Sequence, residues 1–138
     1  MTSEGRWRSL HAELKFIDKN GKTSKFHLHD GSIQSVIETK DHNIWIAASS
    51  GIARLDRENN TFINYYLSEH NNATNYAYRI IEDGQGFFWI STAFGLVRFH
   101  WNLEYSYLFT TLEGLPENRF NANSAFQDSE GILYFGTI

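Results

Sequence analysis

The stretch IIEDGQGFFWISTAFGLVRF, residues 80–99, decides the fold of this chain. It contains short apolar runs separated by an acidic, glycine-containing turn and then by a second glycine. The same order of residues occurs in VIETKDHNIWIAASSGIARLD, residues 36–56, where Trp45 lies 44 residues before Trp89 and Gly51 lies 44 residues before Gly95. The stretch is therefore one copy of an internal repeat.

Two weaker copies flank this pair. In AFQDSEGILYFGTI, residues 125–138, Tyr134 takes the place of the tryptophan, and GRWRSLHAELKFID, residues 5–18, opens with Trp7. A period near 44 without a predicted helix is typical of propeller blades of four strands each. We therefore predict an all-β fold, a β-propeller fragment of about three four-stranded antiparallel blades.

The repeat defines the units of a single predicted domain, residues 1–138. Strands a to d of a blade run outward from the propeller axis, and the first and last units are predicted to be incomplete. The first begins at strand b, and the last ends after strand b. The predicted units are a blade remnant at 5–28, blades at 33–67 and 76–110, and a partial blade at 122–138.

The recurring residues have predicted structural roles. A large ring in the middle of a strand fills the wedge between neighbouring blades, and a glycine permits the turn between strands b and c. An aspartate hydrogen-bonds the backbone of the a–b turn, a role that we also predict for Asp128 and Asp41. The predicted scaffold residues are Trp45, Gly51, Asp83, Trp89, Gly95 and Tyr134.

The composition restricts the class of protein. The chain has 138 residues, 41% of them hydrophobic and 16% aromatic, which is a globular composition. A net charge of −4 predicts no basic face and no nucleic-acid partner. The absence of cysteine excludes disulfides and thiolate metal sites. No apolar run reaches the roughly 18 residues of a membrane span.

We predict no cofactor and no metal. His27 and His29 alternate on one predicted strand face, but no third ligand is evident near them. The segment 18–21 is similar to a calcium loop but lacks the downstream glutamate, and therefore predicts a hairpin turn.

Residues 80–99 resemble the two-component regulator propeller repeat, and the matching residues are Trp89, Thr92, Gly95, Leu96 and Arg98. The resemblance implies a fragment near the end of the propeller in the periplasmic sensor domain of a hybrid two-component histidine kinase. It further implies that the remaining blades, an immunoglobulin-like domain and a kinase belong to the same receptor chain. Such ectodomains respond to saccharides, so an oligosaccharide is the implied ligand.

Function is expected in the loops that do not repeat, because repeated residues build the scaffold. The d-to-a and b-to-c loops of a propeller share one face, and here they carry amides, tyrosines and an arginine, which suit a sugar. These residues are also common in ordinary solvated loops, which is the alternative interpretation. The predicted ligand-binding residues are His70, Asn75, Tyr76, Tyr78, Asn118, Arg119 and Asn121.

The predicted function is a non-catalytic sensor segment that recognises a saccharide and passes the signal to a histidine kinase. The alternative is a protein-interaction propeller without a small-molecule ligand. A propeller enzyme is the third class, with Glu69, Glu113 and Glu117 as the only acidic candidates on the loop face.

An open stack of blades is expected to expose an aromatic-rich sheet face at each end, at a high cost in free energy. We therefore predict a two-fold homodimer in which the incomplete end blades of two chains complete each other.

Overall fold

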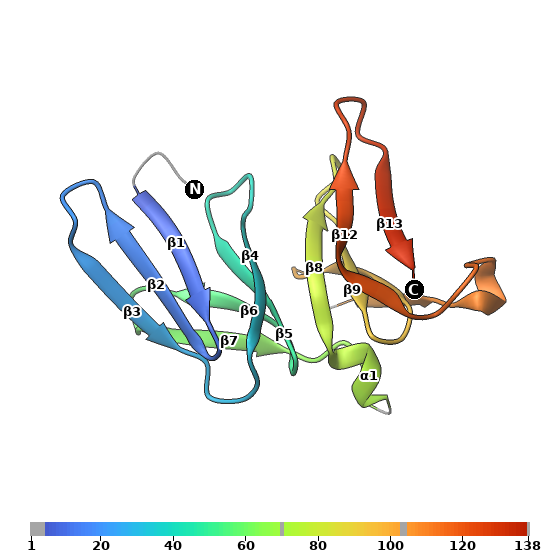
Figure 1. Ribbon diagram of the computed structural model, residues 1–138, viewed down its shortest axis with the longest axis horizontal. Coiled ribbons are helices and arrows are strands. Elements are labelled where there is room, and N and C mark those ends of the chain that lie inside the picture. The colour runs from blue at the N-terminus through green and yellow to red at the C-terminus, as the bar shows by residue number, and fades with distance from the viewer. Residues whose placement is uncertain (1–4, 70, 103–104, 138) are drawn as a thin grey trace.

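The computed structural model describes residues 5–69, 71–102 and 105–137, which form a row of antiparallel sheets (Figure 1). Sheet 1 contains β1 (Gly5–Leu10), β2 (Glu13–Asp18) and β3 (Thr23–His27). Sheet 2 contains β4 (Ile33–Glu38), β5 (Ile44–Ala48), β6 (Gly51–Asp56) and β7 (Thr61–Tyr65). Sheet 3 contains β8 (Ala77–Glu82), β9 (Phe88–Thr92), β10 (Leu96–His100) and β11 (Tyr105–Phe109). Sheet 4 contains β12 (Phe120–Gln127) and β13 (Leu133–Thr137).

In every sheet the strands follow one another in sequence order, each antiparallel to the one before. Sheets 2 and 3 are complete four-stranded meanders, whereas within the described residues sheet 1 contains three strands and sheet 4 contains two. The inner strands β4, β8 and β12 are neighbours in space. The predicted fold class, an all-β propeller fragment, is confirmed.

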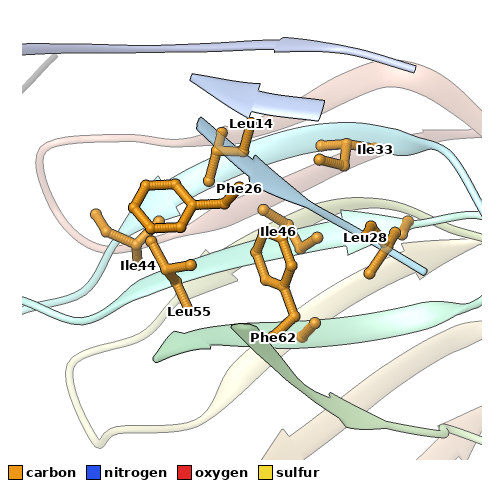
Figure 2. Packing of buried hydrophobic residues seen from close by; sticks show 10 residues of the cluster. Leu14, Phe26, Leu28, Ile33, Ile44, Ile46, Leu55 and Phe62 are labelled. Carbon is orange, nitrogen blue, oxygen red and sulfur yellow. The ribbon is translucent and has the colours of Figure 1, made fainter. Parts of the chain in front are cut away.

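Two apolar clusters join the sheets. The first lies between sheets 1 and 2 and includes Leu14, Phe26, Ile46 and Phe62 (Figure 2). The second lies between sheets 2 and 3, where the ring of Trp45 is 1% exposed. Because side chains alternate along a strand, the central strands β5 and β6 of sheet 2 contribute to both clusters.

The rings at the repeated tryptophan position differ in burial. Trp45 packs edge-on against Phe88 of the next sheet, with ring centroids 4.9 Å apart. Trp89 is half-buried and stacks on Phe109 of its own sheet, and Tyr134 is 51% exposed. Burial falls toward sheet 4 because the described part of the chain places no complete sheet beyond sheet 3.

The a–b turns contain a repeated carboxylate. Asp83 Oδ1 accepts hydrogen bonds from the backbone N–H groups of Gln85 (2.8 Å) and Phe87 (3.0 Å), and Oδ2 accepts one from Trp89 Nε1 (2.8 Å). Asp128 forms the same bonds in sheet 4, with the Tyr134 hydroxyl as donor to Oδ2 at 3.2 Å. The side chain thus connects its own turn to the ring on the following strand.

The counterpart predicted in sheet 2 is shifted by two positions. Thr39, not Asp41, occupies the place of Asp83, and its backbone N–H donates to the carbonyl of Asn43 as that of Asp83 does to Phe87. Asp41 accepts a hydrogen bond from the Thr39 hydroxyl instead. The shift follows from the turn sequence, in which threonine replaces the aspartate of the repeat.

The loops contain two short helices where the repeat pattern predicts none. α1 (Asn72–Asn75) is capped by Asn71, whose side chain accepts a hydrogen bond from the Ala73 N–H, and η1 (Thr111–Glu113) is a single 3₁₀ turn. Local side-chain capping is sufficient for one turn and leaves no periodic signal in the sequence. Neither described helix has the length and apolar character needed to cross a membrane.

The free face of sheet 1 differs from the expected aromatic surface. Leu14 and Phe26 point into the first cluster, so the alternating residues Arg6, Arg8 and Lys25 lie on the opposite, exposed face. The expectation that the chain has no basic face is therefore wrong, because a net charge does not report how charges are distributed among faces.

Candidate functional site

A cleft of about 790 Å³ lies among loops of sheets 1, 2 and 3. The β3–β4 loop contributes Asp30, the β5–β6 turn contributes Ser49 and Ser50, and the segment directly after β7 contributes Tyr66. The β7–β8 loop supplies further lining residues, including Glu69, Asn72 and Asn75. The cleft thus lies on d-to-a and b-to-c loops, the segments in which the sequence predicts function.

Serine hydroxyls connect two of these loops. The Ser50 hydroxyl donates a hydrogen bond to the carbonyl of Asp30 (2.7 Å), and the Ser49 hydroxyl accepts one from the N–H of Ser32 (2.8 Å). Both bonds join the β5–β6 turn to the segment before β4. They hold this wall of the cleft in place.

Asn75 holds the β7–β8 loop. Its Oδ1 accepts hydrogen bonds from the N–H groups of Leu67 (2.6 Å) and Ser68 (2.9 Å), and its Nδ2 donates one to the Ser68 carbonyl (2.6 Å). The residue is 8% exposed. Because its amide is already hydrogen-bonded within the loop, Asn75 positions the wall of the cleft. The neighbouring side chains are the ones available to contact a ligand.

The exposed side chains of the cleft suit a polar ligand. Tyr66 is 66% exposed, and the side chains of Glu69 and Asn72 form no hydrogen bond within the described residues. An aromatic surface next to unengaged amide and carboxylate groups is suited to stacking on, and hydrogen bonding to, a molecule rich in hydroxyl groups.

The charge of the cleft is negative. Asp30 and Glu69 are carboxylates, and no lysine or arginine is among the residues that line the cleft in the described chain. Like charges repel, so this arrangement disfavours an anionic ligand and admits a neutral or cationic one.

The other predicted ligand-binding residues do not line this cleft. Tyr76 and Tyr78 contact each other near the start of β8, with ring centroids 5.4 Å apart. Asn118 is engaged structurally, because its Oδ1 accepts a hydrogen bond from the Thr111 N–H at 2.7 Å. Arg119 and Asn121 are exposed on the segment that leads through β12.

His70, also predicted to bind ligand, lies outside the described residues. Of the predicted set, the structure places Asn75 in the cleft. The predicted set did not include Tyr66, Asp30, Ser49 or Ser50, which also line the cleft. Asp30 and the two serines lie in loops expected on this face, whereas Tyr66 lies inside the predicted blade 33–67.

The carboxylates with perturbed pKa values lie in turns away from the cleft. The Thr39 hydroxyl lowers the pKa of Asp41, and the Asn59 side chain lowers the pKa of Asp56. The backbone N–H of Ile132 lowers the pKa of Asp128. In each case a hydrogen bond to the ionised form is the largest cause, which is a structural role.

The structure brings no metal site together in the residues that it describes. His27 instead approaches Glu13, with 3.5 Å between Nε2 and Oε2. The segment 18–21 forms a hairpin turn, in which Asp18 Oδ1 accepts hydrogen bonds from the N–H groups of Asn20 and Lys22, both at 2.9 Å.

No protein-family profile matches the chain, and no curated protein matches its sequence. Solved structures share its fold. The extracellular domains of two hybrid two-component systems from B. thetaiotaomicron are each 20% identical, with TM-scores of 0.79 and 0.78 over 99% and 97% of this chain. Virginiamycin B lyase from Staphylococcus aureus is 14% identical, with a TM-score of 0.77 over 96% of the chain.

The chain corresponds to a part of each of these proteins. It spans 20% and 21% of the two B. thetaiotaomicron domains and 45% of the lyase. At these identities the similarity shows the fold alone. The resemblance to the two-component regulator propeller repeat is therefore confirmed at the level of the propeller architecture.

Proposed function

We propose that this chain is a segment of an extracytoplasmic sensor domain in a two-component signalling receptor, and that its loop cleft binds a neutral saccharide. The observation that carries the proposal is the cleft itself, in which Tyr66 lies beside the side chains of Glu69 and Asn72. The shared fold with extracellular domains of two-component systems supports the sensor role.

In this proposal the chain changes no covalent bond. Saccharide binding shifts how the sheets pack, and a histidine kinase elsewhere in the receptor responds to the shift. The remaining blades and an immunoglobulin-like domain connect this chain to the kinase. The sensor domain itself lies in the periplasm. The negative charge of the cleft predicts that uncharged oligosaccharides bind and that uronate-containing or sulfated ones do not.

Calorimetric titration of the chain with a panel of neutral and acidic oligosaccharides tests this proposal. We expect Tyr66→Ala to weaken binding of a neutral oligosaccharide by roughly 10-fold or more, because an aromatic stacking surface is lost. Asn72→Ala is expected to weaken it by roughly fivefold, the effect of one hydrogen bond.

Tyr105→Ala is the matched control, since Tyr105 is a 46% exposed tyrosine on β11 that does not line the cleft. Its binding should equal that of the wild type. Binding that is insensitive to Tyr66→Ala, or tighter binding of acidic than of neutral oligosaccharides, would contradict the proposed site.

A further inference from the structure

A groove lies between sheets 1 and 2, at the opposite ends of their strands from the loop cleft. Its volume is about 480 Å³, within the range of roughly 300–1,000 Å³ that is usual for small-molecule sites. Its walls are the paired strands β2 and β3 and the β6–β7 turn. The outer strands β3 and β7 are in contact, so the groove belongs to the packing of two described sheets.

Three aromatic rings of sheet 1 form one side of this groove. The ring centroids of Trp7 and Phe16 are 4.7 Å apart, and those of Trp7 and Phe26 are 6.1 Å apart. Phe26 is buried in the first apolar cluster, whereas Trp7 and Phe16 are half-buried. The rings give the groove a flat, apolar surface.

A guanidinium from sheet 2 lies on these rings. Arg57 Cζ is 5.0 Å from the ring centroid of Trp7 and 5.7 Å from that of Phe16. Within the described residues Arg57 forms no ion pair, and no aspartate or glutamate lines the groove. Because such stacking uses the flat face of a guanidinium, the N–H groups in its plane stay available to a carboxylate.

The contact between sheets 2 and 3 shows why this groove is open. The register pairs Phe16 with Ser24 in sheet 1 and, at the corresponding place in sheet 2, Arg54 with Ile63. There the ring comes from the next sheet, and Arg54 Cζ is 5.7 Å from the ring centroid of Trp101. The first contact thus exchanges cation and ring, and it has a small serine where the second has an isoleucine. The smaller side chain leaves room for a ligand.

Two neutral polar side chains complete the groove. The Ser24 hydroxyl and the Asn60 amide form no hydrogen bond within the described residues. Lys25 also borders the groove, but the alternation along β3 places its side chain on the opposite face from Ser24. Among the lining residues in the described chain, Arg57 is therefore the cation that a ligand would meet.

We propose that this groove binds a small aromatic carboxylate. Its ring packs against Phe16 and Phe26 in the space beside Ser24, and its carboxylate accepts two parallel hydrogen bonds from the guanidinium of Arg57. A sugar acid fits less well, because aromatic walls would leave most of its hydroxyl groups without partners. The site is separate from the loop cleft and does not rest on the function proposed for it.

Calorimetric titration of the complete chain with 2-naphthoate tests the proposal. We expect a dissociation constant on the order of 1 mM. The neutral 2-naphthamide has the same shape without the charge, and we expect it to bind roughly 10-fold more weakly, as we do for glucuronate. In NMR spectra the Nε–H signal of Arg57, assigned through Arg57→Lys, should move downfield when 2-naphthoate binds.

Two chain variants test the two halves of the site. Arg57→Gln removes the charged donor and is expected to weaken 2-naphthoate binding by roughly 10-fold. Ser24→Ile restores the residue found in sheet 2, and by filling the groove it should weaken binding by roughly 10-fold or more. Its thermal unfolding midpoint should not fall, since isoleucine favours a strand. Lys22→Gln removes an exposed cation of the β2–β3 turn outside the groove, and as the matched control it should change the affinity by less than about twofold.

Several results would overturn the proposal. They are no binding at about 10 mM 2-naphthoate, equal or tighter binding of 2-naphthamide or glucuronate, and an unchanged affinity in Arg57→Gln or in folded Ser24→Ile. A loss of affinity in Tyr66→Ala would also overturn it, because it would place 2-naphthoate in the loop cleft. If circular dichroism shows that Ser24→Ile does not fold, Arg57→Gln decides, because the exposed Arg57 side chain is not part of the apolar core.

Discussion

At the scale of single residues, Gly95 is required by the geometry of the b–c turn. Its φ is 92°, and a Cβ atom there would lie 2.5 Å from Leu108 Cδ1 and 2.8 Å from the Phe109 carbonyl oxygen. We expect Gly95→Ala to lower the free energy of unfolding by more than about 1 kcal/mol, since strain and overlap act together. Denaturant unfolding monitored by tryptophan fluorescence measures the loss.

Gly84 provides the matched control for this prediction. It lies in the a–b turn outside the left-handed region, and a Cβ atom there would meet no other atom within 4 Å. Gly84→Ala should leave the free energy of unfolding within about 0.5 kcal/mol of the wild type. Equal losses for both variants would show that backbone geometry at Gly95 is not the cause.

Asp128 makes stability dependent on pH. Hydrogen bonds from the backbone, first that of Ile132, hold its pKa below the ordinary value of 3.8. A carboxylate whose pKa is lower in the folded state stabilises the folded protein at pH values above its unfolded-state pKa. This contribution disappears as the pH falls through the folded-state pKa. We expect the stability difference between wild type and Asp128→Asn to be constant near neutral pH and to shrink below about pH 4.

Thermal unfolding over a pH series measures this difference. Glu130→Gln is the control, because the Glu130 side chain lies in the same turn and forms no hydrogen bond in the described structure. A stability difference between wild type and Asp128→Asn that stays the same at acidic pH would contradict the role of the ionised carboxylate.

At the scale of elements, the contact between sheets 2 and 3 depends on Trp45. Its ring packs against Tyr65 and Phe88 at centroid distances of 5.3 and 4.9 Å and is 1% exposed. Trp45→Ala is expected to cost about 3–5 kcal/mol, the cost of removing a buried aromatic ring. Leu112→Ala, at a residue 92% exposed, should cost less than about 0.5 kcal/mol.

Equilibrium denaturation of both variants checks this prediction, with circular dichroism as the probe because Trp45→Ala alters the fluorescence. A loss below about 1 kcal/mol for Trp45→Ala would mean that the two sheets are held together mainly by other contacts.

At the scale of the whole molecule, the two ends differ in chemistry. Sheet 1 exposes Arg6 and Arg8, whereas sheet 4 exposes Phe126 (61%) and Tyr134 (51%), with ring centroids 6.1 Å apart. The two-fold dimer that joins these ends stays a prediction. We expect the aromatic end to be the contact surface of any self-association, because water disfavours exposed apolar surface and strongly hydrates arginine.

Light scattering across a dilution series measures this association. We expect the average mass to rise with concentration, and Phe126→Lys to reduce the rise, because a charge is introduced into the apolar contact. Lys25→Glu on the basic face should leave it unchanged. If Lys25→Glu reduced the rise in average mass and Phe126→Lys did not, the association would instead involve sheet 1.

The sequence by itself determined the repeated architecture. Trp45 and Trp89 recur at the same position relative to Gly51 and Gly95, and the turn between strands is encoded within each repeat by local backbone preferences. Strand order and pairing then follow, because neighbouring strands in one meander can pair in only one way when the connecting turns are short.

Only the tertiary structure decided where the candidate cleft and the charged face lie. The cleft combines Asp30, Ser50 and Tyr66 from separate loops, and their approach depends on how sheets 1, 2 and 3 pack. Likewise, the alternation of Arg6, Trp7 and Arg8 predicts two faces, but not which face another sheet covers. Local patterns encode the strands, whereas packing between sheets determines which side chains meet and which remain exposed.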